Sequence, residues 1–167
     1  LNIMSGARRE SEELAGVAVM VSRLLDEGTG TRTSLEIAEA IESVGGAIET
    51  DGGHDRIGVF LGALSKDIDL GMELVADIVL DPAFNDENIE KDRERTLAEI
   101  RSARDRPQVV AGWEFNELVY KGHPLHRPVH GYPETIEAIE RGNLRAFHES
   151  FFVPNNAIVS VVGDFAT

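Results

Sequence analysis

The chain has 167 residues, of which 42% are hydrophobic, so it is long enough to bury a core and is expected to form one folded, soluble domain. Its 30 acidic and 16 basic residues give a net charge of -14, which disfavours nucleic acid and anionic membrane surfaces as partners. The absence of cysteine excludes disulfides, thiol catalysis and cysteine-ligated metals.

Residues 1–4 alternate as a short strand, and Ser5-Gly6-Ala7 interrupts it. The chain thus begins in what looks like the interior of a strand, and residues 163–167 end it without a closing element. We expect residues 1–167 to be a single domain from a longer polypeptide, lacking its first strand and a following domain. A targeting signal would lie outside it, so no compartment is assigned.

Residues 13–29 predict one helix that ends at Gly28. Its apolar residues recur at the spacing that places them on one helix face; they are Leu14, Val17, Ala18, Val21, Leu24 and Leu25. Val19, Ser22 and Arg23 fall outside this stripe.

Ser34 is expected to cap a second helix, which ends at Gly45-Gly46. Residues 47–50 and 56–62 then predict two strands of a hairpin around Asp51-Gly52-Gly53.

A third helix is expected to begin near Ser65 and to end at Asp81-Pro82. A long charged helix follows over residues 86–104, and Pro107 is well placed in the first turn of the next helix. In that helix, Trp113 is interpreted as a core anchor.

The three prolines in residues 123–133 predict an irregular loop. Helices over residues 135–139 and 143–152 and a buried β-branched strand over residues 157–162 complete the chain. This order predicts an α+β fold with one mainly antiparallel β-sheet and helices packed on one of its faces.

Two sets of residues could carry chemistry. His123, His126 and His130 have a spacing that could bind a metal, but the prolines between them favour rings that are splayed apart in a structural loop. Asp92 and Glu99 lie about two turns apart and so share one face of the charged helix. Considered alone, this pair is typical of a solvated helix rich in ion pairs.

Several segments, in order, resemble the insulinase or pitrilysin family of zinc peptidases, which includes the mitochondrial processing peptidase subunits. The matching segments are Gly6 to Glu10, Gly16 and Ala18 leading to Leu24-Leu25 and Gly28-Thr29, Ile41 to Gly46, Asp81 to Phe84, Ile89 to Ile100, His123-Pro124 through Gly131, and Phe151 to Asp164. The likeness covers nearly the whole chain and implies that residues 1–167 form one insulinase-like domain.

Active members of the family carry His-x-x-Glu-His on the first helix and a third zinc ligand, a glutamate, on the later charged helix. The resemblance places Val19, Ser22 and Arg23 at the three motif positions, Glu99 at the glutamate ligand, and Asp92 at a supporting acid. Valine cannot ligate, serine is a poor base, and arginine brings a fixed positive charge. The resemblance therefore implies an inactive member with a vacated zinc site, no metal and no catalytic residue.

In active relatives the edge strand after the double glycine offers Asn-Ala to an extended substrate, and Glu49 and Thr50 stand there in this chain. Strand-edge binding uses backbone groups, so peptide capture remains compatible with these residues.

The resemblance leads to a first hypothesis, a non-catalytic half that pairs with a catalytic zinc-peptidase half, in a dimer or a multi-domain clamshell, around a shared peptide or protein substrate. Zinc would then belong to the catalytic partner. A second hypothesis is an assembly module without a proteolytic partner, and a third is an enzyme that uses the histidine loop.

One structural expectation follows from the vacated site. A carboxylate held inside a domain requires a cation or several hydrogen-bond donors. We therefore predict that Arg23 points toward Glu99 or Asp92.

Overall fold

The structure is a computed structural model that describes residues 1–164. The α-helices of this part are α1 (Val17–Leu24), α2 (Ser34–Ser43), α3 (Ile68–Leu80), α4 (Asp86–Arg104), α5 (Pro107–Val119), α6 (Pro133–Ala138) and α7 (Arg141–Phe151). Its strands are β1 (Asn2–Ile3), β2 (Ala47–Gly52), β3 (Ile57–Gly62) and β4 (Ala157–Ile158).

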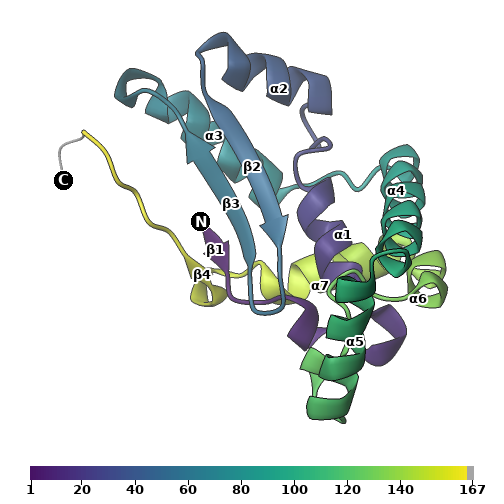
Figure 1. The fold of residues 1–167 in the computed structure, drawn as a ribbon. Helices are drawn as coiled ribbons and strands as arrows, with labels where there is room; N and C mark the ends of the chain where they lie inside the picture. The colour runs from purple at the N-terminus through teal and green to yellow at the C-terminus, as the bar shows by residue number, and fades with distance from the viewer. Residues whose placement is uncertain (165–167) are drawn as a thin grey trace.

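The four strands form one antiparallel sheet in the order β2-β3-β1-β4 (Figure 1). Ile57 and Val59 of β3 are buried and point toward the helices. Phe60, which follows Val59 and points to the other face, is 47% exposed. The sheet is therefore covered on one face, where α1 and α3 contact it. This confirms the predicted α+β class.

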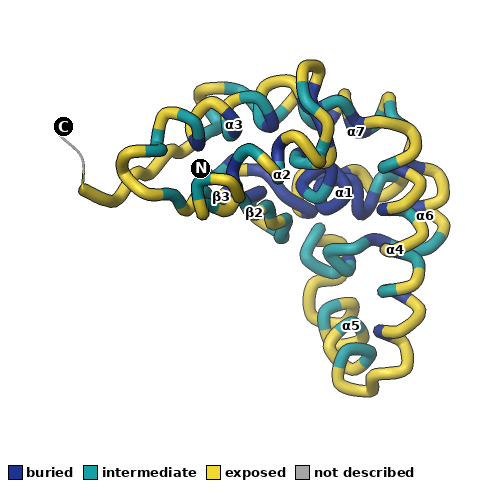
Figure 2. The backbone as a smooth tube through the Cα atoms, turned by 90° about the horizontal axis from the view of Figure 1, so that it is seen from above, coloured by how far each residue is buried: buried dark blue, intermediate teal, exposed yellow. Residues whose placement is uncertain are grey.

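Helix α1 is the centre of the fold and contacts β2, α4 and α7 (Figure 2). All of its residues are buried except Arg23. Helices α4 and α5 lie beyond the β2 side of the sheet, and α5 projects away from the body of the molecule (Figure 2). The prediction of a one-sided apolar stripe was therefore wrong for α1, because Val19 and Ser22 are as deeply buried as the stripe.

The start of α1 also differs from the prediction. Residues 12–14 form a separate 3-10 turn, and Gly16 adopts a left-handed conformation with φ 102° before the helix begins at Val17. The Glu10 carboxylate takes the place of a local cap, since it accepts hydrogen bonds from the backbone N–H groups of Gly16 (3.0 Å) and Ala18 (2.7 Å). Three-and-four spacing alone could not reveal this tertiary cap.

Elsewhere the predicted boundaries are close to the structure. Helix α4 has the predicted bounds, Pro107 begins α5, and the hairpin is present. The cap of α2 is Thr33 and not Ser34, because Thr33 and Glu36 form a reciprocal capping box.

Two burial predictions were wrong. Trp113 is half-buried, and α5 has no buried residue, because that helix packs mainly on α4 and on the loop that follows α5. The last strand ends at Ile158, and residues 159–162 are exposed because they pair with no strand among the described residues. No helix within residues 1–164 has the length and apolar character needed to cross a membrane.

Candidate functional site

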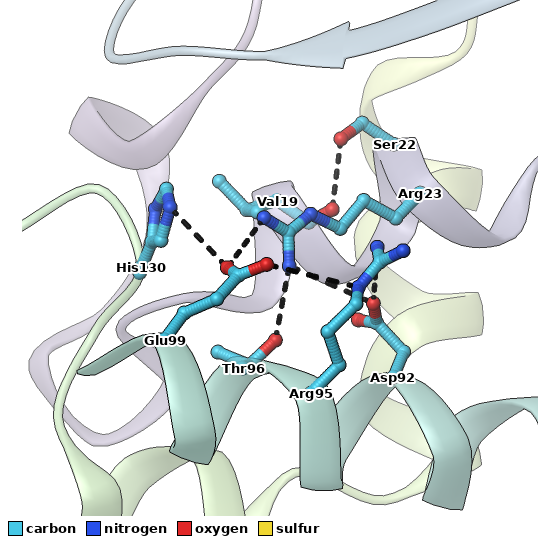
Figure 3. Close-up of polar contacts among 8 residues, drawn as sticks. All are labelled: Val19, Ser22, Arg23, Asp92, Arg95, Thr96, Glu99 and His130. Carbon is cyan, nitrogen blue, oxygen red and sulfur yellow. Dashed lines mark hydrogen bonds and ion pairs between the residues drawn. The ribbon is translucent and has the colours of Figure 1, made fainter. Parts of the chain in front are cut away.

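The candidate site lies where α1 packs against α4 (Figure 3). Arg23 extends from α1 toward α4, where its Nη2 donates to Glu99 Oε2 at 2.8 Å. Its Nη1 donates to Thr96 Oγ1 at 3.2 Å and lies 3.7 Å from Asp92 Oδ1. The prediction that Arg23 points toward Glu99 or Asp92 is confirmed.

Val19 and Ser22 lie one turn apart on α1 and have little contact with solvent. They are 3% and 0% exposed, and the Ser22 hydroxyl donates to the Val19 carbonyl oxygen at 2.8 Å. Gly52 at the end of β2 presses on both, because a Cβ there would lie 2.6 Å from Ser22 Oγ and 3.2 Å from Val19 Cα. The Ser22 hydroxyl is thus buried and hydrogen-bonded within its own helix, so it cannot act as a base on a bound substrate.

Asp92 is the buried carboxylate of the site, with a side chain that is 5% exposed. Its Oδ1 accepts a hydrogen bond from Arg95 at 2.8 Å, and its Oδ2 has no partner among the described residues. Burial raises the pKa of Asp92, and the positive charges of Arg23 and Arg95 oppose that rise. The two arginines therefore support an ionised carboxylate at this buried position.

His130 also faces the site, with its Nε2 3.7 Å from Glu99 Oε2 (Figure 3). Burial and then the nearby Arg23 lower the pKa of His130, so the imidazole is mainly neutral at pH 7. The sequence grouped His130 with the other loop histidines, and no spacing rule connects residue 130 with residue 99.

The histidine loop does not form one cluster. His123 Nδ1 accepts a hydrogen bond from the N–H of Leu125 at 3.2 Å, and His126 Nδ1 lies 2.7 Å from Glu117 Oε2. The structural interpretation of these two histidines is confirmed, while His130 alone turns toward Glu99.

The residues at the site do not fit a zinc ion. Zinc requires three or four converging imidazole, carboxylate or thiolate ligands. Here a guanidinium covers Glu99, and residues 1–164 contain no group of three His, Cys, Asp or Glu side chains arranged to hold a metal. The arrangement provides an ion pair that joins α1 to α4, next to the backbone at the end of β2.

Strand β2 forms one edge of the sheet within residues 1–164. Glu49 lies opposite Phe60 and points to the open face, whereas Thr50 lies opposite Val59 and points to the helix side. Val59 exchanges its backbone bonds with Leu1, so antiparallel alternation turns the N–H and C=O groups of Thr50 to the free edge.

A cavity of about 360 Å³ extends from the turn of the β2–β3 hairpin to Glu99 of the ion pair. Its lining includes His54, Glu99, Trp113 and His130. The free strand edge and the cavity thus lie on the side of the molecule to which Arg23 and Glu99 belong.

Comparisons with known proteins connect this geometry to a family. Residues 1–132 match the profile of the insulinase family, peptidase family M16. The chain belongs to the insulinase family. It is 33% identical over 159 residues to an uncharacterized zinc protease of Mycobacterium leprae, and the match covers 95% of this chain and 36% of that protein.

Two further proteins are similar to this chain. An M16 peptidase inactive domain from Pseudomonas fluorescens has a similar structure, with a TM-score of 0.84 and 23% identity over 88% of this chain and 36% of that one. Subunit 1 of the mitochondrial cytochrome b-c1 complex of Caenorhabditis elegans is 27% identical over 96% of this chain and 34% of its own length. The chain therefore spans about a third of the length of these relatives.

Proposed function

We propose that this domain is the non-catalytic half of an insulinase-type peptidase and helps a catalytic zinc-containing half to enclose a peptide. The catalytic half is a second chain or another part of the same polypeptide. The observation that carries the proposal is the Arg23 guanidinium on Glu99, at the position that the family resemblance assigns to a metal ion. A fixed cation there satisfies the carboxylate and leaves no role for zinc.

The peptide-binding part of the proposal rests on β2 and the adjoining cavity. An extended peptide can add to a free strand edge through main-chain hydrogen bonds, for which the outward groups of Thr50 are available. The cavity that reaches from His54 to Trp113 offers space for a side chain of that peptide. In this proposal these features bind and orient a peptide and do not cleave it.

A quenched-fluorescence peptide assay tests this proposal. The 167-residue chain alone should cleave no peptide, with or without added zinc, because Ser22 is buried and Glu99 is paired. Together with its catalytic half, it should support hydrolysis that a chelator abolishes and that Glu99→Ala in this domain leaves intact. Zinc-dependent cleavage by the isolated chain, lost in Glu99→Ala, would overturn the proposal.

An assembly module without a proteolytic partner is the second candidate function. It is favoured by the similarity to a subunit of the cytochrome b-c1 complex, a protein named for its place in an assembly. The same assay separates the two candidates. An assembled complex that contains this domain, and neither binds nor cleaves peptides, would favour the assembly module.

A further inference from the structure

The cavity of about 360 Å³ beside the ion pair differs in charge from the chain as a whole. Two arginines, Arg106 and Arg127, line it together with a single carboxylate, Glu99. The complete chain, in contrast, has 30 acidic residues and 16 basic ones. An excess of arginine at one concave site of a strongly acidic chain indicates a place where an anion is favoured.

The charge of the one carboxylate in the lining is already offset. Glu99 Oε2 accepts a hydrogen bond from Arg23 at 2.8 Å, and Glu99 Oε1 lies 3.9 Å from Arg95 Nε (Figure 3). Burial lowers the pKa of His54 and of His130, the two imidazoles of the lining, so both are mainly neutral at pH 7. The arginines therefore determine the sign of the charge in the cavity.

Arg127 gives the cavity wall a fixed positive charge. The residue is 5% exposed, and its Nη2 donates to the carbonyl oxygens of Ala7 at 3.3 Å and Glu10 at 3.0 Å. These neutral acceptors satisfy hydrogen bonds and leave the charge in place. The nearby Glu10 carboxylate offsets that charge only in part, because burial raises the pKa of Glu10 to about 7.

Arg106 is the cation that a ligand in the cavity can reach. It is the N-cap residue of α5 and is exposed, and none of the ion pairs within residues 1–164 includes it. Val109 and Trp113 of the same helix give the cavity apolar surface. An anion can thus pair with Arg106 without displacing a carboxylate of the described chain.

We propose that this cavity selects a carboxylate on an apolar stem, and that Arg106 determines this specificity. The stem lies against Val109 and Trp113, and the carboxylate pairs with Arg106. The proposal rests on the proposed peptide-binding function and gives it a substrate class, namely peptides that place an acidic group at the cavity. A glutamate side chain and the carboxylate at the end of a peptide both have this chemistry.

Four short peptides test the specificity. Three are alanine pentapeptides with blocked ends and glutamate, glutamine or lysine at the centre, and the fourth is the glutamine peptide with a free terminal carboxylate. Affinity for the 167-residue chain is measured by calorimetry at pH 7, and the fluorescence of Trp113, the only tryptophan of the chain, reports whether the peptide occupies the cavity.

The glutamate peptide should bind about fivefold more tightly than the blocked glutamine peptide, which corresponds to a partly screened ion pair, and the lysine peptide should bind most weakly. Tighter binding of the glutamine peptide with the free terminus than of the glutamate peptide would identify the chain end as the source of the carboxylate. Both results support a site for carboxylates.

Two arginine variants separate a contact in the cavity from the general charge of the domain. Arg106→Gln should bind the glutamate and blocked glutamine peptides with equal affinity. Arg104→Gln is the matched control, because Arg104 is also exposed but lines a neighbouring cavity and not this one. The control should retain most of the preference for glutamate.

Equal affinities of the unmodified chain for all four peptides would overturn the proposal and leave peptide capture intact. The same loss of preference in both variants, or binding of the glutamate peptide without a change in Trp113 fluorescence, would also overturn it. If none of the peptides binds, both the proposal and the peptide-binding part of the proposed function are wrong.

Discussion

At the scale of single residues, the site depends on Arg23, which joins α1 to two carboxylates of α4. Its guanidinium reaches a carboxylate that is largely buried, Asp92, and one that is partly exposed, Glu99. Arginine suits this role because it is permanently charged and its planar fork can serve several acceptors at once. The cation that pairs with these carboxylates is thus covalently part of α1.

Removal of Arg23 should destabilise the fold. Arg23→Ala leaves the buried Asp92 with Arg95 as its remaining cation, and we expect a loss of about 1–3 kcal/mol in the free energy of unfolding, measured by urea denaturation at pH 7. The matched control is Arg95→Ala, because Arg95 also binds Asp92 but its side chain is 54% exposed. Arg95→Ala should lower the free energy of unfolding by less than about 1 kcal/mol. Equal losses in the two variants would contradict the account.

Glu10 is expected to make stability depend on pH. Burial, opposed by hydrogen bonds from Gly16 and Ala18, raises the pKa of Glu10 from 4.5 to about 7. The folded state then binds the proton more tightly than the unfolded state. The contribution of Glu10 to stability is therefore greatest below about pH 4.5 and falls as the pH rises toward about 7, by up to about 3 kcal/mol.

The comparison with Glu10→Gln isolates this effect. A glutamine side chain is neutral at every pH and offers one acceptor oxygen in place of two. The loss of that acceptor changes the free energy of unfolding by an amount that does not vary with pH. Urea denaturation of both proteins between pH 4.5 and 7.5 should show the difference between them shifting in favour of the variant as the pH rises. A constant difference would argue against a raised pKa at this position.

At the scale of elements, α1 is the helix on which the site and the core both depend. It starts from a left-handed glycine and a distant carboxylate, and its buried side chains contact the sheet, α4 and α7. Arg23 can reach Glu99 only because this packing fixes the position of α1 against α4. Disturbance of the start of α1 should therefore affect the whole domain.

Gly16→Ala tests this dependence. The residue has φ 102°, and a Cβ there would lie 2.5 Å from Ile136 Cδ1 and 2.9 Å from the His130 carbonyl oxygen. We expect a loss of about 2–4 kcal/mol in urea denaturation, from backbone strain and overpacking together. Gly112→Ala in α5 is the control, because a Cβ there meets nothing within 4 Å and should stabilise its helix by about 0.5–1 kcal/mol. A neutral Gly16→Ala would mean that the chain around α1 can relax.

The elements also show what the sequence could predict. The bounds of α4 follow from local signals, namely a continuous charged helical pattern and a proline just after it. The start of α1 could not be predicted from local signals, because its cap is a carboxylate held by tertiary contacts. Apolar character predicted burial for Trp113 and for residues 157–162, but pattern does not say whether a partner surface is present. Similarly, His130 reaches Glu99 through the fold alone.

At the scale of the whole molecule, the two sides of β3 carry different features. The β2 side carries the ion pair, the free strand edge and the cavity that we propose for peptide binding. The β1 side carries an apolar groove between β3 and residues 159–162.

The zinc content of the purified chain, measured by elemental analysis after dialysis against zinc, tests the central claim most directly. Three proteins are compared: the unmodified chain, the variant Val19→His/Ser22→Glu/Arg23→His, and a control with only Val19→His and Ser22→Glu. We predict no stoichiometric zinc in the unmodified chain or in the control, which keeps Arg23 on Glu99, and about one zinc per chain in the three-site variant. Stoichiometric zinc in the unmodified chain, lost in Glu99→Ala, would contradict the account.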